Sequence, residues 1–227
     1  MTRHISAALA LGLCAACSFA ASAFFEKGEA AFVANKPQEA RPLLEGALAE
    51  DPANETIYLY LGIVYQQLGD PEKSTATFKR GLAVPGTRKD LLYYNIGNNL
   101  FSRKDYALAE EMYTSALAAN ARLPEASLNR ANTRLAVKAF EGAITDYTMF
   151  LQLRPADPQR PKIEEVIRLL RLSLDEEARK RAEEAARQAA LMNDVMNALN
   201  TAGEGTQNIS VESIQVRQDS QDIDIKD

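Results

Sequence analysis

Apolar and polar positions alternate with helical spacing along most of the chain. In the stretch 58–65, four residues share one face of a helix at i, i+3, i+4 and i+7: Tyr58, Leu61, Gly62 and Tyr65. Leu68-Gly69-Asp70-Pro71 follows and predicts a helix stop, because Gly adopts the left-handed end position and Pro opens the next helix. A partner helix follows, with Ser74, Phe78 and Leu82 on one face.

The same pattern returns with one period. Three sequence columns repeat at steps of 34, 35 and 34 residues: a small column (Gly28, Gly62, Gly97, Ala131), a second small column (Ala40, Ser74, Ala109, Ala143) and a large column (Leu44, Phe78, Tyr113, Tyr147). The extra residue falls near Pro85-Gly86-Thr87, where a loop absorbs it at little cost. The sequence therefore predicts an all-α fold, an array of about four helical hairpins.

These columns, with Pro52 and Pro155, resemble the signature of the tetratricopeptide repeat, a helix–turn–helix unit. The resemblance covers about Ala21 to Pro155 and implies an α-solenoid over 24–157. The fourth unit departs from the signature at Ser127, Arg130 and Phe150. By this resemblance, the array is a superhelical scaffold that binds other proteins and is rarely an enzyme.

A long helix is predicted after the array, over 158–200. Residues 162–200 contain no Gly or Pro, and Ala, Leu, Arg and Glu dominate. Its first part is expected to cap the array. Its second part, 178–199, carries small and apolar residues at alternating steps of four and three: Ala178, Ala182, Ala185, Ala189, Met192, Met196 and Leu199. Two interpretations stay open, a solvated single helix held by ion pairs and a coiled coil that self-associates or binds a partner.

Both ends of the chain differ from the repeats. Residues 1–23 have a basic start, a short apolar run and a small-residue end, which predicts a signal peptide. Two processing routes are open: cleavage after Ala21-Ser22-Ala23, or a lipobox at Ala15-Ala16-Cys17-Ser18 with Cys17 lipidated. Either route predicts export to the periplasm or cell envelope, with membrane attachment only through Cys17. Residues 201–227 are polar and acidic, which predicts a disordered tail.

The first helix of each unit lines the concave groove in the family that the repeats resemble. By register, the groove presents one set of polar and aromatic residues: Tyr60, Tyr94, Asn95, Asn98, Phe101, Asn129 and Asn132. The four Asn residues form two N-x-small-N motifs, so stacked units are expected to build a ladder of carboxamides. Carboxamides donate and accept hydrogen bonds, which suits an extended peptide. The alternative is that these Asn residues bond neighbouring helix ends within the array.

A free carboxylate is a poor candidate ligand for this groove. In the family's carboxylate-binding members, Asn occupies the positions of Asn98 and Asn129. A Lys stands there four residues before the first Asn, and Tyr94 stands at that position here.

Composition narrows the remaining chemistry. The 26 Lys and Arg against 31 Asp and Glu give a net charge of −5, which disfavours duplex nucleic acid. His4, Cys14 and Cys17 all lie within the first 17 residues, so we expect no His or Cys catalysis, no metal site and no cofactor in the folded part. The predicted function is an exported, non-catalytic adaptor that binds a protein or peptide segment in the envelope.

The sequence supports two further hypotheses, a narrower family similarity and an alternative function. The stretch Leu92-Tyr93-Tyr94-Asn95-Ile96-Gly97-Asn98 is similar to repeats in Bat-type aerotolerance proteins of bacterial envelopes. The alternative function is a periplasmic small-ligand-binding accessory of a transporter. A pocket closed by Phe25, Phe32 and Tyr60 would favour that alternative.

Overall fold

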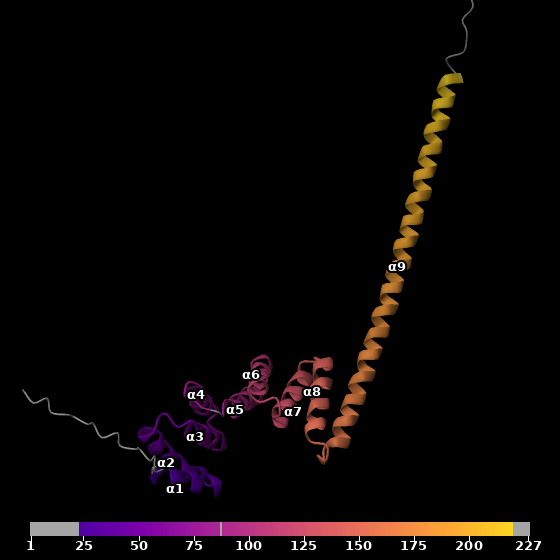
Figure 1. Ribbon diagram of the computed structural model, residues 1–227. Coiled ribbons are helices and arrows are strands. Elements are labelled where there is room, and N and C mark those ends of the chain that lie inside the picture. The colour runs from indigo at the N-terminus through magenta and orange to yellow at the C-terminus, as the bar shows by residue number, and fades with distance from the viewer. Residues whose placement is uncertain (1–22, 87, 220–227) are drawn as a thin grey trace, which may run out of the picture. The chain divides into compact units, whose positions relative to one another are not determined.

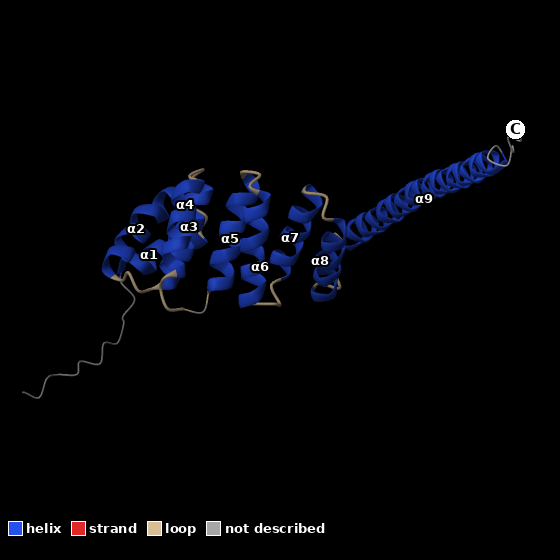
Figure 2. Ribbon diagram, turned by 90° about the horizontal axis from the view of Figure 1, so that it is seen from above, coloured by secondary structure: helices blue, strands red, loops and turns tan. Residues whose placement is uncertain are grey.

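The computed structural model describes residues 23–86 and 88–219, with side chains described through Leu199 and at Thr201. Throughout these residues the regular structure is helical and contains no strand, as the sequence predicts (Figure 2). The chain divides into two compact units, Met1–Ile163 and Glu164–Asp227.

Eight helices of the first unit form four successive hairpins (Figure 1). Each predicted repeat corresponds to one hairpin, with a first and a second helix: α1 (Ala23–Val33) and α2 (Pro37–Glu50), α3 (Glu55–Gln67) and α4 (Pro71–Leu82), α5 (Lys89–Ser102) and α6 (Tyr106–Ala119), and α7 (Pro124–Ala136) and α8 (Phe140–Leu153). The α-solenoid expected from the periodic columns is therefore confirmed.

The first helices of the hairpins adjoin one another. Each helix of the array packs against its neighbours in the chain. In addition, α3 packs against α1 and α5, and α5 packs against α7. In the described part of the array, no such contact joins the second helices α2, α4, α6 and α8 to each other. The side made by α1, α3, α5 and α7 is therefore the inner side of the solenoid, where a groove was expected.

The small and large columns meet inside each hairpin. A Cβ added to Gly97 would stand 2.6 Å from Cε1 of Tyr113, and one added to Gly28 would stand 2.9 Å from Cδ2 of Leu44. The ring of Phe78 likewise occupies the space where a Cβ of Gly62 would be. The large residues of this column are all buried. The small residue thus allows close helix approach, and the large one fills the gap beyond it, as the period predicts.

A left-handed residue recurs at the turn inside each hairpin. The backbone φ is positive at Asn35 (54°), Gly69 (76°), Lys104 (65°) and Lys138 (61°). Only the second unit has the Gly that this conformation favours. The following helix α4 is capped by Asp70, whose Oδ1 accepts from the backbone N of Lys73 at 3.0 Å.

One departure in the fourth unit, Arg130, takes part in an ion cluster around a buried Asp. Asp146 on α8 is fully buried. Its carboxylate accepts hydrogen bonds from the guanidinium groups of two residues of α7, Arg130 at 2.7 and 2.8 Å and Arg134 at 2.9 Å. Arg134 also reaches Glu110 on α6 at 2.7 Å. The Arg that replaces a Leu at position 130 is therefore paired, and the cluster ties three helices together.

Helix α9 (Arg160–Asp219) follows the array. It starts two residues after the predicted boundary at 158 and passes the expected end at 200. The structure thus gives residues 201–219, where the sequence predicts a disordered tail, as a continuation of this helix. No Pro follows Pro161, and Gly203 and Gly205 each disfavour a helix by only about 1 kcal/mol relative to Ala. Residues 220–227, and nearly all of the predicted signal peptide 1–23, lie outside the described residues.

Candidate functional site

Six side chains of α5, α6 and α7 line a pocket of about 260 Å³. We call it the amide pocket, and its residues are Asn98, Phe101, Ser102, Tyr113, Asn129 and Asn132. Four of the seven residues predicted to bind a partner, Asn98, Phe101, Asn129 and Asn132, are thus brought together. None of the six lining residues carries a charge.

Asn98 is at the centre of the hydrogen bonds in this pocket. Its Oδ1 accepts from the Tyr113 hydroxyl at 2.9 Å and from Nδ2 of Asn129 at 2.8 Å. The same Asn129 nitrogen donates to the hydroxyl of Tyr94 at 3.3 Å. Because an amide has its oxygen and nitrogen on opposite sides, these contacts fix the orientation of the Asn98 side chain.

The Tyr–Asn pair of the third unit recurs in the fourth. The Tyr147 hydroxyl on α8 donates to Oδ1 of Asn132 at 2.7 Å. Burial raises the pKa of the Tyr113 and Tyr147 hydroxyls above the ordinary value of 10, and Tyr94 adds to this effect at Tyr113. Both hydroxyls therefore stay protonated at neutral pH and remain donors to the amide oxygens.

These contacts leave polar groups available inside the pocket. Among the described residues, none accepts a hydrogen bond from Nδ2 of Asn98 or Asn132, and none donates to Oδ1 of Asn129. These three atoms lack a partner within the described chain, but none of them is a buried atom, so all three are open to solvent. The pocket thus offers two donors and one acceptor, all uncharged, beside the ring of Phe101. Such a set matches neutral groups that donate and accept, as a peptide backbone does.

Asn95 and Tyr94 lie differently from the other predicted residues. Nδ2 of Asn95 donates to the backbone oxygen of Leu91 in its own helix at 2.8 Å, so this amide does not line the pocket. The predicted ladder of four carboxamides is therefore three in the amide pocket. Tyr94 is not a lining residue, but its hydroxyl accepts from Asn129 and its ring lies 6.1 Å from that of Tyr113 between centroids.

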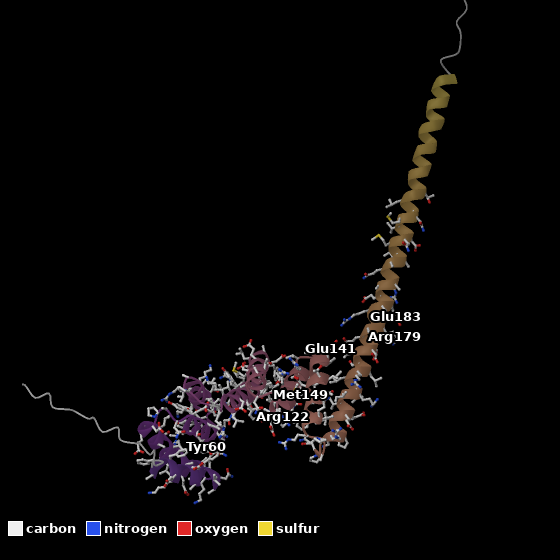
Figure 3. All side chains as sticks on the ribbon, in the orientation of Figure 1. Tyr60, Arg122, Glu141, Met149, Arg179 and Glu183 are labelled. Atoms are coloured by element: carbon white, nitrogen blue, oxygen red, sulfur yellow. The ribbon has the colours of Figure 1, made fainter. Side chains whose placement is uncertain are left out.

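Tyr60 belongs to a separate aromatic cluster near the start of the array (Figure 3). Its ring stacks on Phe32 with centroids 4.6 Å apart and lies parallel to Phe25 at 6.2 Å. Its hydroxyl donates to Oε1 of Glu29 at 3.2 Å. The two Phe rings thus both stack on the ring of Tyr60.

Tyr113, Tyr147 and Ser102 are not among the residues predicted from the sequence to bind a partner. The period places the two Tyr residues in the buried large column, where they do lie. The signal was present, because that column changes from Leu44 and Phe78 to Tyr in the two units that have Asn98 and Asn132 on the facing helix. A hydroxyl in a core column needs a partner, and these Asn residues supply it.

Two kinds of feature are absent from the part of the chain that the structure describes. Within 23–86 and 88–219, no helix is both long and apolar enough to cross a membrane. Among the side chains that the structure describes, no group of three His, Cys, Asp or Glu could bind a metal ion. Cys17, the predicted lipidation residue, lies outside the described residues.

Two family models, both described as tetratricopeptide repeat, match the chain. One matches residues 31–86, and the other matches 4–55 and 94–159. The chain is also similar to Tetratricopeptide repeat protein 16 of Homo sapiens, with 28% identity over 128 residues. That alignment covers 54% of this chain and 15% of the relative, so the chain spans a small part of that protein's length.

Solved structures share the fold. The crystal structure of MamA protein superposes with a TM-score of 0.57 at 20% identity and covers 65% of this chain and 78% of that chain. MamA from Desulfovibrio magneticus RS-1 gives 0.57 at 18% identity, with coverage of 67% and 84%. Cut9–Hcn1, a hetero-tetramer of the APC/C, gives 0.57 at 16% identity, with coverage of 65% and 29%. With its period, its paired helices and the family match over more than half of its length, the chain belongs to the tetratricopeptide repeat family.

Proposed function

We propose that this protein is an exported adaptor that holds an extended protein segment in the amide pocket. The tetratricopeptide repeat fold suggests a scaffold for protein interactions. The amide pocket contains hydrogen-bonding groups of Asn98, Asn129 and Asn132 that have no partner within the described chain. The observation that carries the proposal is the Asn98 amide, fixed by Tyr113 and Asn129 so that its Nδ2 is available to a ligand. The proposed role includes no catalysis.

The absence of charge in the pocket lining supports a neutral ligand group. A carboxylate binds best beside Arg or Lys, which supply charge-assisted hydrogen bonds. The amide pocket has Asn, Ser, Tyr and Phe only. Backbone amides within a segment have donors and acceptors and no net charge, so they fit the lining better than a free chain terminus does.

The alternative of a small-ligand accessory has less support. It was tied to a pocket closed by Phe25, Phe32 and Tyr60. Those rings stack on each other, with Tyr60 bonded to Glu29. The uncharged amide pocket, by contrast, is an open feature of the inner helices α5 and α7.

Export rests on the sequence of residues 1–23 alone. Its basic start, apolar run and Ala21-Ser22-Ala23 support a cleaved signal, and Cys17 supports a lipid anchor as the second route. Mass spectrometry of the mature protein from membrane and soluble envelope fractions distinguishes the routes. A Cys17→Ala variant that loses membrane attachment indicates lipidation, whereas an unprocessed cytoplasmic chain contradicts export.

The binding proposal is tested by variants of the pocket amides. Asn98→Ala with Asn132→Ala removes both available donors, and we expect loss of the proteins that the wild-type chain retains from envelope extracts. Asn95→Ala is the matched control, because that amide is satisfied within its own helix. Circular dichroism checks that each variant is folded.

A photo-crosslinking residue identifies the partner directly. Replacing Phe101, which lines the pocket, should give a crosslinked product in living cells, and the product should disappear with the double Asn variant. Replacing Leu108, 51% exposed on α6 and outside the lining, is the control. Equal crosslinking from both positions, or unchanged retention by the double variant, would contradict the proposal.

A further inference from the structure

The C-terminal unit carries an apolar face that nothing in the described chain covers. On α9, the side chains of Met192, Met196 and Leu199 are 63%, 50% and 62% exposed. The Ala residues that precede them in the same four–three alternation, Ala182, Ala185 and Ala189, are also exposed. An alternation of four and three residues is the spacing of a coiled-coil seam. We call residues 182–199 of α9 the seam segment.

Charge is absent from the borders of this seam. In the heptad that the alternation defines, the flanking positions between Ala182 and Leu199 are occupied by Ala186, Gln188, Asn193 and Val195. The charged residues Glu183, Glu184, Arg187 and Asp194 stand on the other side of the helix. Around the start of the seam segment, ion pairs form within α9: Glu176–Lys180 at 2.8 Å, Glu177–Arg181 at 3.3 Å and Arg179–Glu183 at 3.3 Å. Figure 3 labels the two residues of the last pair.

The seam is small at one end and large at the other. Two copies side by side in the same direction would place Ala against Ala at one end and Met and Leu against themselves at the other. A helix pair cannot keep one separation along such a seam without leaving a gap at the Ala end. Two copies in opposite directions place Ala182 against Leu199, Ala185 against Met196 and Ala189 against Met192. Every layer then has one small and one large residue, and the two helices fill space evenly.

The match of small against large residues therefore sets the direction. Arg179 and Arg181, which flank the Ala end of each copy, are paired within their own helix with Glu183 and Glu177. We infer that the seam segment of α9 forms an antiparallel two-stranded coiled coil with a second copy of this chain. This inference does not depend on the amide pocket.

A membrane surface is the competing occupant, and the segment fits it less well. Interfacial helices use aromatic anchors and a polar face rich in Lys and Arg. Residues 160–219 contain no Phe, Trp or Tyr, and the charges beside the seam are of both signs. A 3.5-residue repeat is also a coiled-coil feature, because it keeps the seam on one side only when two helices wind around each other.

The first experiment measures the mass of the full chain by sedimentation equilibrium. We expect twice the 24.9 kDa of one chain. Met192→Glu with Met196→Glu puts charges into two layers and should weaken dimerisation by at least about 100-fold, because each Glu would lose its water on association. Leu191→Glu is the matched control. Leu191 is 66% exposed but lies outside the seam, so this variant should remain a dimer.

The second experiment determines direction by disulfide formation. In a full chain with Cys14→Ser and Cys17→Ser, one tagged variant carries Ala182→Cys and another carries Leu199→Cys. An antiparallel pair places residue 182 of one copy beside 199 of the other. It separates equivalent residues by about 25 Å along the axis. We therefore expect a mixed disulfide between the two variants and none in either variant alone.

Three results would overturn the inference. One is a monomeric mass for the wild-type chain at tens of micromolar, and a second is disulfide formation within each single variant, which indicates parallel helices. The third is a monomer that sediments with phosphatidylglycerol–phosphatidylethanolamine vesicles and loses this property with Met192→Glu and Met196→Glu. That third result would assign the face to a membrane surface. Circular dichroism of the Glu variants checks that α9 remains helical.

Discussion

The hydroxyl of Tyr113 donates to Oδ1 of Asn98 at 2.9 Å, so a residue of the hydrophobic core orients a residue of the amide pocket. The ring of Tyr113 is buried against Gly97, and the same side chain lines the pocket. The same pair, Tyr147 and Asn132, occurs one repeat later at 2.7 Å. Core packing and the candidate binding site are therefore coupled through single hydroxyl groups.

Removing one of these hydroxyls tests that coupling. Tyr113→Phe keeps the ring in its core position but leaves Asn98 with one fewer donor. We expect the free energy of unfolding to fall by about 1 kcal/mol, the usual net value of one hydrogen bond. Partner retention should fall as well, because the amide is less firmly oriented. Urea denaturation measures the first effect, and pull-down from envelope extracts measures the second.

A double-mutant cycle isolates the interaction. Combined with Asn98→Ala, Tyr113→Phe should cost less than it does alone, because its partner is already gone. Tyr93→Phe, a substitution of the same kind outside the pocket lining, is the control and should leave retention unchanged. Strictly additive losses in the cycle would show that the two side chains do not act together.

Much of this fold could be predicted from periodicity, because backbone packing imposes the period on the sequence. Gly62 and Phe78 recur in register with Gly97 and Tyr113, and these pairs do meet inside the hairpins. The turn positions followed the same period, although only Gly69 is visible as a turn residue in the sequence. Lys104 and Lys138 also have positive φ, which is unfavourable for a residue with a side chain. Their residue type does not show this conformation in the sequence.

The site was harder to predict from the sequence than the fold, because the direction of a hydrogen bond depends on side-chain rotamers rather than on repeat register. Asn95 and Asn129 occupy equivalent positions one repeat apart, yet one donates to its own helix at Leu91 and the other crosses to Asn98. The two preceding units differ at the position that Asn129 contacts. Asn129 bonds to Asn98 there, and the position equivalent to Asn98 in the unit before Asn95 holds the apolar Ile63. Register places both amides on one side of the array, but only the neighbour decides where each one bonds.

Tyr65 gives this protein a specific response to alkaline pH. Burial raises the pKa of its hydroxyl from 10 to about 12, and the hydrogen bond to Glu45 at 2.7 Å adds to this. The folded chain holds this proton more tightly than the unfolded chain does. The stability that Tyr65 contributes is therefore complete below pH 10 and is lost as the pH rises from 10 to 12. Denaturation at a series of pH values should show a smaller loss over that interval in Tyr65→Phe than in the wild-type chain.

Asp146 is expected to be among the charged residues most sensitive to substitution. Asp146→Ala leaves the guanidinium groups of Arg130 and Arg134 without this fully buried partner. We expect a loss of about 3–5 kcal/mol in the free energy of unfolding, as for a broken buried pair. Glu125→Ala breaks the pair with Arg154 at 2.6 Å, whose side chains are 44% and 52% exposed, and should cost less than about 1 kcal/mol. Similar losses in both variants would indicate that the buried cluster has no special role.

The recurring left-handed turn predicts opposite effects for two substitutions. Gly69→Ala adds a Cβ that meets nothing within 4 Å, so any cost arises from φ at 76° alone. We expect a loss of about 1 kcal/mol, the lower end of the steric penalty for this conformation. Lys104→Gly removes the same steric penalty at φ 65° but also gives the unfolded chain more conformational freedom. We therefore expect the free energy of unfolding to rise by no more than about 1 kcal/mol. Thermal denaturation of both variants measures these shifts. A stabilising Gly69→Ala or a destabilising Lys104→Gly would show that contacts of the turn, rather than its backbone conformation, determine its stability.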